Sequence, residues 1–244
     1  VAGGRAIFAT EFDNATLWTS DGTEDGTIKI AEFSQINELV VVNNTVYFTA
    51  LQDSETEFYR TDGTVAGTAM VKNLNGSGSA DPKNLVAFNN KLIFTAVEED
   101  NGRELWVTDG TAEGTKLVKD ISSGVDHGTI NPQTVVLGDH FFFTADDGEH
   151  GSELWKSDGT AEGTILLKDI VPGSDDSRPG KFKVIDDKIY FQAFTPEHGY
   201  EVWVSDGTAA NTNLLFDLIE GPDYSNPEAF TNVNKSIVFF GLTP

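Results

Sequence analysis

The feature that most constrains the fold is a short sequence that recurs five times. Each copy has an aromatic residue, two further residues and Asp-Gly-Thr, usually followed two residues later by Gly-Thr. A period of about 40 to 50 residues is typical of the blades of a β-propeller or of a similar repeat array. Residues that recur in every copy are therefore interpreted first as parts of a scaffold. The Asp residues of the five copies lie 41, 47, 49 and 48 positions apart, at Asp21, Asp62, Asp109, Asp158 and Asp206.

Four short strands are predicted in each repeat. The first often opens with Pro, as at Pro82 and Pro227, where the missing N–H does not disturb strand pairing. A tight turn of Asn, Asp or Gly leads into a second strand that is almost continuously apolar, as in residues 92–96, and is expected to be buried on both faces. The third strand carries the aromatic residue and runs into Asp-Gly-Thr, and the fourth is represented by residues 116–121.

This pattern predicts an all-β fold: a β-propeller of five blades, each with four antiparallel strands. Residues 1–244 would form a single domain of five repeats of about 48 residues. The alternative is an excerpt of a longer propeller or repeat array. Both stay open because residues 5–10 read as a second strand, whereas residues 229–233 and 236–241 read as an additional first and second strand. Residues 229–233 would either close a ring with the first blade or belong to a further repeat.

Charge and composition exclude several classes of partner. The chain has 39 Asp and Glu against 16 Lys and Arg, which gives a net charge of −23 and a pI near 4.3. Such a field repels phosphate backbones, so nucleic acid is not an expected partner. No apolar run approaches the roughly 18 residues that a membrane span needs, so membrane insertion is not expected. The absence of Cys removes disulfides, thiolate metal sites and Cys nucleophiles.

Two copies of the motif carry a family resemblance. Residues 104–115 and 153–164 both begin with Glu-Leu-Trp and continue through Asp-Gly-Thr to a second Gly-Thr, and in this they resemble the bacterial ELWxxDGT repeat. The resemblance covers essentially the whole chain, with departures at Thr16, Tyr59 and Asn211. It implies a large secreted or surface-attached bacterial repeat protein, and it implies no agreed biochemical activity.

Physical reasoning assigns the motif a structural role. The Asp is expected to bond the backbone N–H groups that follow it, the Gly to adopt a positive φ, and the Thr to resume the strand, which closes a hairpin between the third and fourth strands. The aromatic residue is expected to pack between blades, with a partner for an indole N–H; a sugar-stacking platform is the alternative. The residues predicted to form this structural motif are Trp18, Asp21, Tyr59, Asp62, Trp106, Asp109, Trp155, Asp158, Trp203 and Asp206.

Acidic loops between the second and third strands suggest a metal site. Ca²⁺ takes six to eight oxygen ligands, at about 2.3–2.6 Å, and Gly-spaced acids supply such oxygens. Residues 98–104 and 146–153 have this composition, although neither matches the EF-hand spacing. Asp146, Asp147 and Glu149 are the predicted ligands, and Ca²⁺ is the one cofactor that the sequence indicates.

Enzymatic activity is not predicted. The four His residues, at positions 127, 140, 150 and 198, lack metal-ligand spacing, and the sequence has no G-x-S-x-G, HExxH or phosphate-binding loop. A glycosidase would need paired carboxylates unique to single blades, whereas most acidic residues here recur in the same turn or loop.

The predicted function is therefore that of a non-enzymatic structural or adhesive module, secreted or on the bacterial cell surface. Its expected partners are other surface or extracellular proteins, or copies of itself. The alternative is multivalent, lectin-like carbohydrate binding, because repeated blades can present one pocket several times. The candidate surface for glycans is the set of variable loops at residues 122–131, 172–179 and 220–226, which includes Tyr224.

Overall fold

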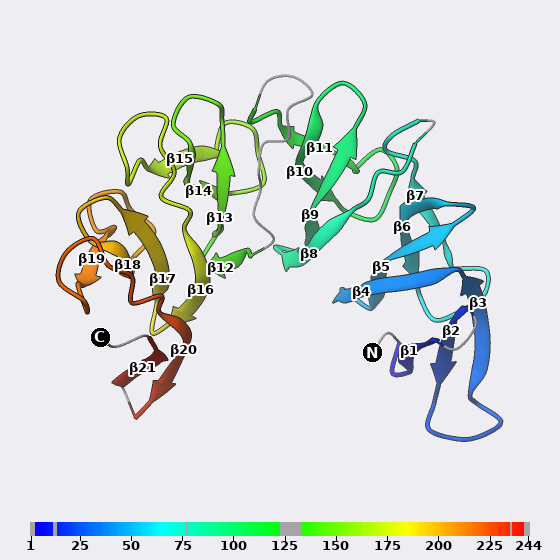
Figure 1. The fold of residues 1–244 in the computed structure, drawn as a ribbon. Helices are drawn as coiled ribbons and strands as arrows, with labels where there is room; N and C mark the ends of the chain where they lie inside the picture. The colour runs from blue at the N-terminus through cyan, green and yellow to red at the C-terminus, as the bar shows by residue number, and fades with distance from the viewer. Residues whose placement is uncertain (1–2, 12–13, 77, 123–132, 235, 242–244) are drawn as a thin grey trace. The chain divides into compact units, whose positions relative to one another are not determined.

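The structure is a computed structural model that describes residues 3–11, 14–76, 78–122, 133–234 and 236–241. These residues form 21 strands in antiparallel sheets of three, four, four, four, four and two strands in chain order (Figure 1). The predicted all-β fold, with blocks of four antiparallel strands, is confirmed. No helix in the described part of the chain is long and apolar enough to cross a membrane. The chain divides into two compact units, Val1–Asp120 and Ile121–Pro244.

The first unit contains one three-stranded sheet and two four-stranded sheets. The three-stranded sheet lacks a first strand, as predicted, since β1 pairs with the strand that carries the motif. The strands are β1 (Ala6–Glu11), β2 (Ala15–Ser20) and β3 (Ile28–Phe33); β4 (Gln35–Val42), β5 (Thr45–Gln52), β6 (Glu55–Thr61) and β7 (Ala69–Lys72); β8 (Lys83–Phe88), β9 (Lys91–Glu98), β10 (Gly102–Thr108) and β11 (Lys116–Lys119).

The second unit contains two four-stranded sheets and one two-stranded sheet. The first strand of its first sheet was predicted from Pro132; Pro132 lies outside the described residues, and the strand begins at Val135. The strands are β12 (Val135–Leu137), β13 (His140–Asp146), β14 (Ser152–Ser157) and β15 (Ile165–Lys168); β16 (Gly180–Ile185), β17 (Lys188–Thr195), β18 (Gly199–Ser205) and β19 (Asn213–Phe216); β20 (Glu228–Val233) and β21 (Ser236–Phe240).

The additional first and second strands pair with each other. β20 and β21 form a separate antiparallel hairpin, which gives residues 236–240 the place that the sequence pattern left unassigned. Five blades in a single domain, and the closure of a ring, stay predictions.

The second strands β5, β9 and β13 are buried on both faces, as their apolar sequences predict, whereas the second-type strands β1 and β21 at the chain ends are mostly exposed. Phe48, Phe94, Phe143 and Phe191 occupy the same register opposite the motif aromatic, and each is 0% exposed. Within each unit the apolar clusters join successive sheets; in the first unit, Phe58 of β6 stacks on Phe94 of β9 with ring centroids 4.8 Å apart. Sheet-to-sheet contact therefore depends on the aromatic residues of the central strands.

The position of Phe94 between two sheets predicts how its removal changes the stability of the protein. We expect Phe94→Ala to lower the free energy of unfolding by about 3–5 kcal/mol, because the cavity would sit between two sheets. Phe216→Ala is the control, since Phe216 is 53% exposed, and it should change stability by less than about 0.5 kcal/mol. Urea unfolding followed by Trp fluorescence measures both; equal stabilities for the two variants would contradict the packing described.

Candidate functional site

The Asp-Gly-Thr motif builds the same hydrogen-bonded turn in all five repeats. In the third repeat, Asp109 Oδ1 accepts hydrogen bonds from the backbone N–H of Thr111 at 2.9 Å and from its hydroxyl at 2.7 Å. Gly110 has a φ of 93°, which favours glycine. The hydroxyl and the N–H of Thr111 hold the pKa of Asp109 below its usual value. The same pair of bonds is accepted by Asp21, Asp62, Asp158 and Asp206.

The Thr of this motif does not resume the strand, which corrects one detail of the prediction. Thr111 stays in the turn, and β11 begins at Lys116. A second Thr completes the turn: the hydroxyl of Thr115 donates to the Thr111 carbonyl at 2.6 Å and lies 2.6 Å from the hydroxyl of Thr108. The hairpin between the third and fourth strands is present, but it is longer than predicted.

The second glycine of the motif makes room for the Asp side chain. A Cβ on Gly114 would collide with the carboxylate of Asp109, and Gly26, Gly67 and Gly163 have the same relation to their own Asp residues. In the fifth repeat Asn211 takes this place, and its side-chain amide donates to Asp206 Oδ2 at 2.7 Å. At Asn211 a side-chain hydrogen bond to the Asp therefore takes the place of the close approach that Gly allows in the other repeats.

The motif aromatic residues are mostly buried between sheets, as predicted. Tyr59, Trp106 and Trp203 are 8%, 3% and 8% exposed, and each belongs to a cluster that also contains residues of the preceding sheet in its unit. Trp155 is buried as well. Trp18 is half-buried, and its indole N–H donates to the hydroxyl of Thr10 at 3.0 Å.

Not every indole satisfies the expectation of a hydrogen-bond partner. The indole nitrogens of Trp106 and Trp203 are buried without one in the described part of the chain. The Nζ of Lys72 lies 5.8 Å from the centre of the Trp106 ring. Burial leaves Trp106, Trp155 and Trp203 without an open face on which a sugar could stack.

The role of the Glu that lies two residues before the motif aromatic was not predicted from the sequence. Glu153 is fully buried, and its carboxylate accepts hydrogen bonds from the N–H groups of Ile170 at 2.9 Å and Ser177 at 3.0 Å, and from the Ser177 hydroxyl at 2.6 Å. The N–H of Val171 lies 3.3 Å away as a further donor. Burial raises the pKa of Glu153 to about 7. The side chain thus fixes the loop that leads from β15 to β16.

Equivalent Glu residues hold equivalent loops. Glu201 accepts from the N–H of Leu218 at 3.0 Å and from the hydroxyl of Ser225 at 2.7 Å, which are 17 and 24 residues further on, the same separations as for Glu153. Glu57 accepts from the N–H of Ala80 at 3.2 Å, and burial raises its pKa to about 6. Glu104 is also buried. The recurrence of Glu at this position was visible in the sequence, but its distant partners were not.

The predicted metal ligands do not gather into a site. Asp146 accepts from the N–H of Gly148 at 2.7 Å, while Asp147 accepts from the N–H groups of Glu149 and His150 at 3.0 and 2.9 Å. Across the described residues no group of three or more His, Asp or Glu side chains is placed to hold a metal ion. Calcium binding stays a prediction, but the structure does not bring Asp146, Asp147 and Glu149 together as a set of ligands.

The His residues take structural positions where they are described. His150 Nδ1 lies 2.8 Å from Asp147 Oδ2, and His198 Nδ1 lies 2.8 Å from Asp217 Oδ2. The bond to Asp147 raises the pKa of His150 above its usual value. His140 begins β13, and His127 lies outside the described residues.

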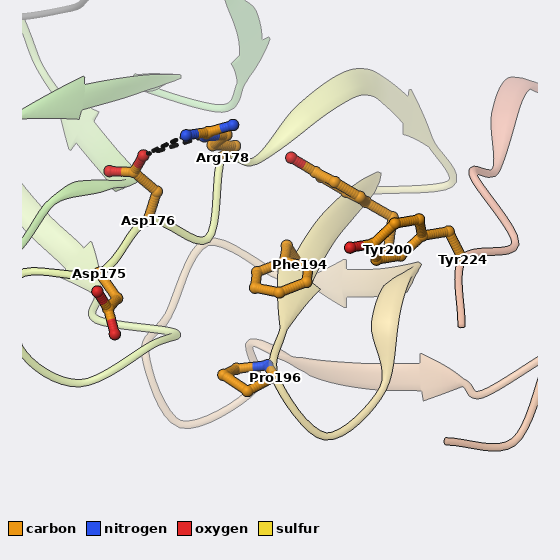
Figure 2. Close-up of a pocket in the computed structure, with 7 residues that line it drawn as sticks. All are labelled: Asp175, Asp176, Arg178, Phe194, Pro196, Tyr200 and Tyr224. Carbon is orange, nitrogen blue, oxygen red and sulfur yellow. Dashed lines mark hydrogen bonds and ion pairs between the residues drawn. The ribbon is translucent and has the colours of Figure 1, made fainter. Parts of the chain in front are cut away.

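The candidate site is a pocket of about 320 Å³ in the second unit (Figure 2). It lies between two of the three loops predicted as a binding surface, because residues 172–179 and 220–226 both contribute to it. The hairpin between β17 and β18 contributes the rest and was not predicted. Of the third predicted loop, only Ser122 is among the described residues. The lining residues are Asp175, Asp176, Arg178, Phe194, Pro196, Tyr200 and Tyr224.

One side of the pocket is aromatic. The ring centroid of Phe194 lies 5.4 Å from that of Tyr200 and 6.1 Å from that of Tyr224, and the two Tyr centroids are 5.7 Å apart. Tyr224 is 50% exposed. Figure 2 shows the hydroxyl groups of both Tyr residues directed toward the side on which Asp176 and Arg178 lie.

The other side of the pocket is polar and charged. Asp176 Oδ2 accepts from Nε of Arg178 at 3.0 Å and from its terminal nitrogen at 2.8 Å, while Oδ1 accepts from the N–H of Ser152 at 2.9 Å. Both oxygens of Asp176 are thus engaged, and this side chain orients the guanidinium. Asp175 is exposed beside the pair. The pocket can therefore offer an apolar surface together with both hydrogen-bond donors and acceptors.

Comparisons with known proteins define the class of fold. No family model and no curated protein matches the chain. Among solved structures, it is similar to puromycin hydrolase, with a TM-score of 0.55 and 11% identity over 98% of this chain and 42% of that one. It is also similar to the β-propeller domain of the Trilobed protease from Pyrococcus furiosus, with a TM-score of 0.53 and 13% identity over 99% and 72% of the two chains.

A third similar structure is a putative TolB from Agrobacterium tumefaciens, with a TM-score of 0.51 and 10% identity over 88% of this chain and 78% of that one. At such identities the likeness shows the fold alone. The chain is a β-propeller protein built from repeats, and it spans about two-fifths of the length of puromycin hydrolase.

The turn geometry makes an unusual prediction at Gly114. Gly114→Ala should destabilise the protein by about 1–3 kcal/mol, because the methyl group overlaps the carboxylate of Asp109 and forces it to move, without a new hydrogen bond in return. Gly114→Asn should be tolerated better, because the new amide can bond the carboxylate as Asn211 does. Glu113→Ala is the exposed control. Thermal unfolding ranks the variants. If the Asn variant is as unstable as the Ala variant, the side-chain hydrogen bond does not compensate for the loss of the glycine.

The raised pKa of Glu153 predicts how stability varies with pH. The folded state holds the Glu153 proton more tightly than the unfolded state does. The contribution of this group to the free energy of unfolding is therefore complete below pH 4.5 and is lost as the pH rises to about 7. The shift corresponds to roughly 3 kcal/mol. Glu153→Gln should lose the Glu153 part of this decline and keep the part due to Glu57, whose pKa is raised to about 6, whereas the exposed control Glu162→Gln should keep both. Urea unfolding across this range measures the slopes; identical slopes for all three proteins would contradict a raised pKa.

Proposed function

We propose that this chain is a non-enzymatic module of an extracellular or cell-surface bacterial protein, serving structure or adhesion. The observation that carries the proposal is how the recurring acidic residues are used. The Asp of each repeat holds its own turn, and Glu153 and Glu201 hold the loops between sheets. Acidic groups engaged in this way serve the fold and are not set aside for chemistry on a substrate.

The similar structures do not alter this proposal. Puromycin hydrolase and the Trilobed protease are named for hydrolytic activities, but a likeness at 11% and 13% identity carries the fold and not an active site. The motifs that would place a Ser nucleophile or a catalytic zinc are absent from the sequence.

The proposed partners are other surface or extracellular proteins, or copies of this chain. A net charge of −23 makes copies repel one another at low ionic strength, so self-association should be strongest where salt screens that repulsion. Saline surroundings outside a cell provide this screening.

Carbohydrate binding is the second candidate function, and the pocket of Figure 2 favours it. Aromatic rings and several polar groups converge there on a cavity of about 320 Å³, the size range of small-molecule sites.

Adhesion can be tested with beads that carry the folded chain. We expect coated beads to aggregate, or to bind bacterial cell surfaces, increasingly as salt is raised, while beads with heat-unfolded chain do not. In parallel, peptide and glycoside substrates should not be turned over. Dispersed beads together with turnover that co-purifies with the folded chain would overturn the proposal.

A further inference from the structure

The aromatic residues of the pocket depart from the repeat. Tyr200 directly precedes the buried Glu201, and the residues that precede Glu57, Glu104 and Glu153 are Thr56, Arg103 and Ser152. A position occupied by Thr, Arg and Ser elsewhere does not need an aromatic ring for the fold. Tyr200 is thus a feature of one blade.

The same holds for the other two rings. Phe194 follows the core residue Phe191 by three positions, where the other complete repeats have Leu51, Val97 and Asp146. Tyr224 precedes Ser225, and the equivalent residue before Ser177 is Asp176. Three aromatic rings therefore meet at one place through substitutions that the repeat does not require.

The polar groups of the pocket are held by the fold. Buried Glu153 fixes Ser177, which lies between Asp176 and Arg178, and buried Glu201 fixes Ser225 beside Tyr224. Asp176 in turn orients Arg178 through two hydrogen bonds. The two walls are positioned before any ligand arrives, which lowers the entropic cost of binding.

From this arrangement we infer that the pocket binds one neutral pyranose ring of a glycan. A pyranose has a face of C–H groups that can pack on the exposed ring of Tyr224, and its hydroxyl groups both donate and accept hydrogen bonds. Asp175 accepts, the guanidinium of Arg178 donates, and the hydroxyls of Tyr200 and Tyr224 do either. The inference rests on the carbohydrate-binding function proposed above and narrows it to a single, unrepeated site.

Charge disfavours an anionic ligand, which would meet Asp175 and the field of a chain with a net charge of −23. The same field attracts a cation, which could approach the aromatic rings, and only the guanidinium of Arg178 opposes it. A simple cation would leave the donor groups of the pocket unused, whereas a neutral ligand with hydroxyl groups can both donate to Asp175 and accept from Arg178.

The test is a titration of the full chain with the methyl glycosides of glucose, galactose, mannose and N-acetylglucosamine, followed by amide chemical shifts in NMR. We expect at least one glycoside to shift the amides of Arg178, Tyr200 and Tyr224. Tyr224→Ala should weaken that binding by about tenfold, because the stacking surface is lost. Tyr224→Phe should retain most of the affinity, and Phe216→Ala, which removes an exposed ring outside the pocket, should retain all of it.

The outcomes separate this inference from the function on which it rests. A glycoside that binds wild type and Tyr224→Ala equally, with shifts elsewhere, would leave carbohydrate binding intact and overturn the pocket assignment. No shifts with any of the four glycosides would count against both. Choline is the cationic probe, and shifts at the pocket with choline but not with the glycosides would overturn the assignment to a neutral sugar.

Discussion

The contact on which the loops of this protein depend is a buried carboxylate near the start of the motif strand in the second to fifth repeats. Burying a carboxylate is costly unless hydrogen bonds replace its hydration. Donors from Ile170, Val171 and Ser177 offset part of this cost for Glu153, whose pKa burial still raises to about 7, and donors from Leu218 and Ser225 offset part of it for Glu201. Each Glu therefore joins the strand that carries it to the residues leaving its sheet and to the residues entering the next one. Both walls of the pocket follow from this constraint.

Two kinds of residue can then be distinguished along the chain. Recurring residues build the blades: the Asp that closes each turn, the Gly that makes room for it, and the aromatic residues between sheets. Non-recurring residues sit on positions where the repeat tolerates variety, and they gather at the pocket as Phe194, Tyr200 and Tyr224. In the proposed function, the repeat scaffold lets a binding site arise by substitution at positions where the other repeats have different side chains.

Much of the fold could be predicted from the sequence, because its signals are local. The apolar second strands, the Asp-Gly turn and the buried aromatic residues all follow from residues close together in the chain. The Thr of the motif was wrongly expected to resume the strand, since the second Thr completes a longer turn. The role of Glu153 was missed because its partners lie 17 to 24 residues away. Part of the pocket was predicted, because the composition of residues 172–179 and 220–226 indicated a binding surface. Phe194 and Tyr200 were not predicted, because they lie on strands and only the tertiary structure brings them to these loops.

Amide hydrogen exchange of the loop between β15 and β16 tests the central claim most directly. If Glu153 holds this loop, the N–H groups of Ile170 and Ser177 should exchange as slowly as those of the buried strand β14, because they are released only when the blade opens. The N–H of Leu218, held by Glu201, should behave likewise. Exchange of these amides as fast as that of the exposed Gly173 in the same loop would contradict the account.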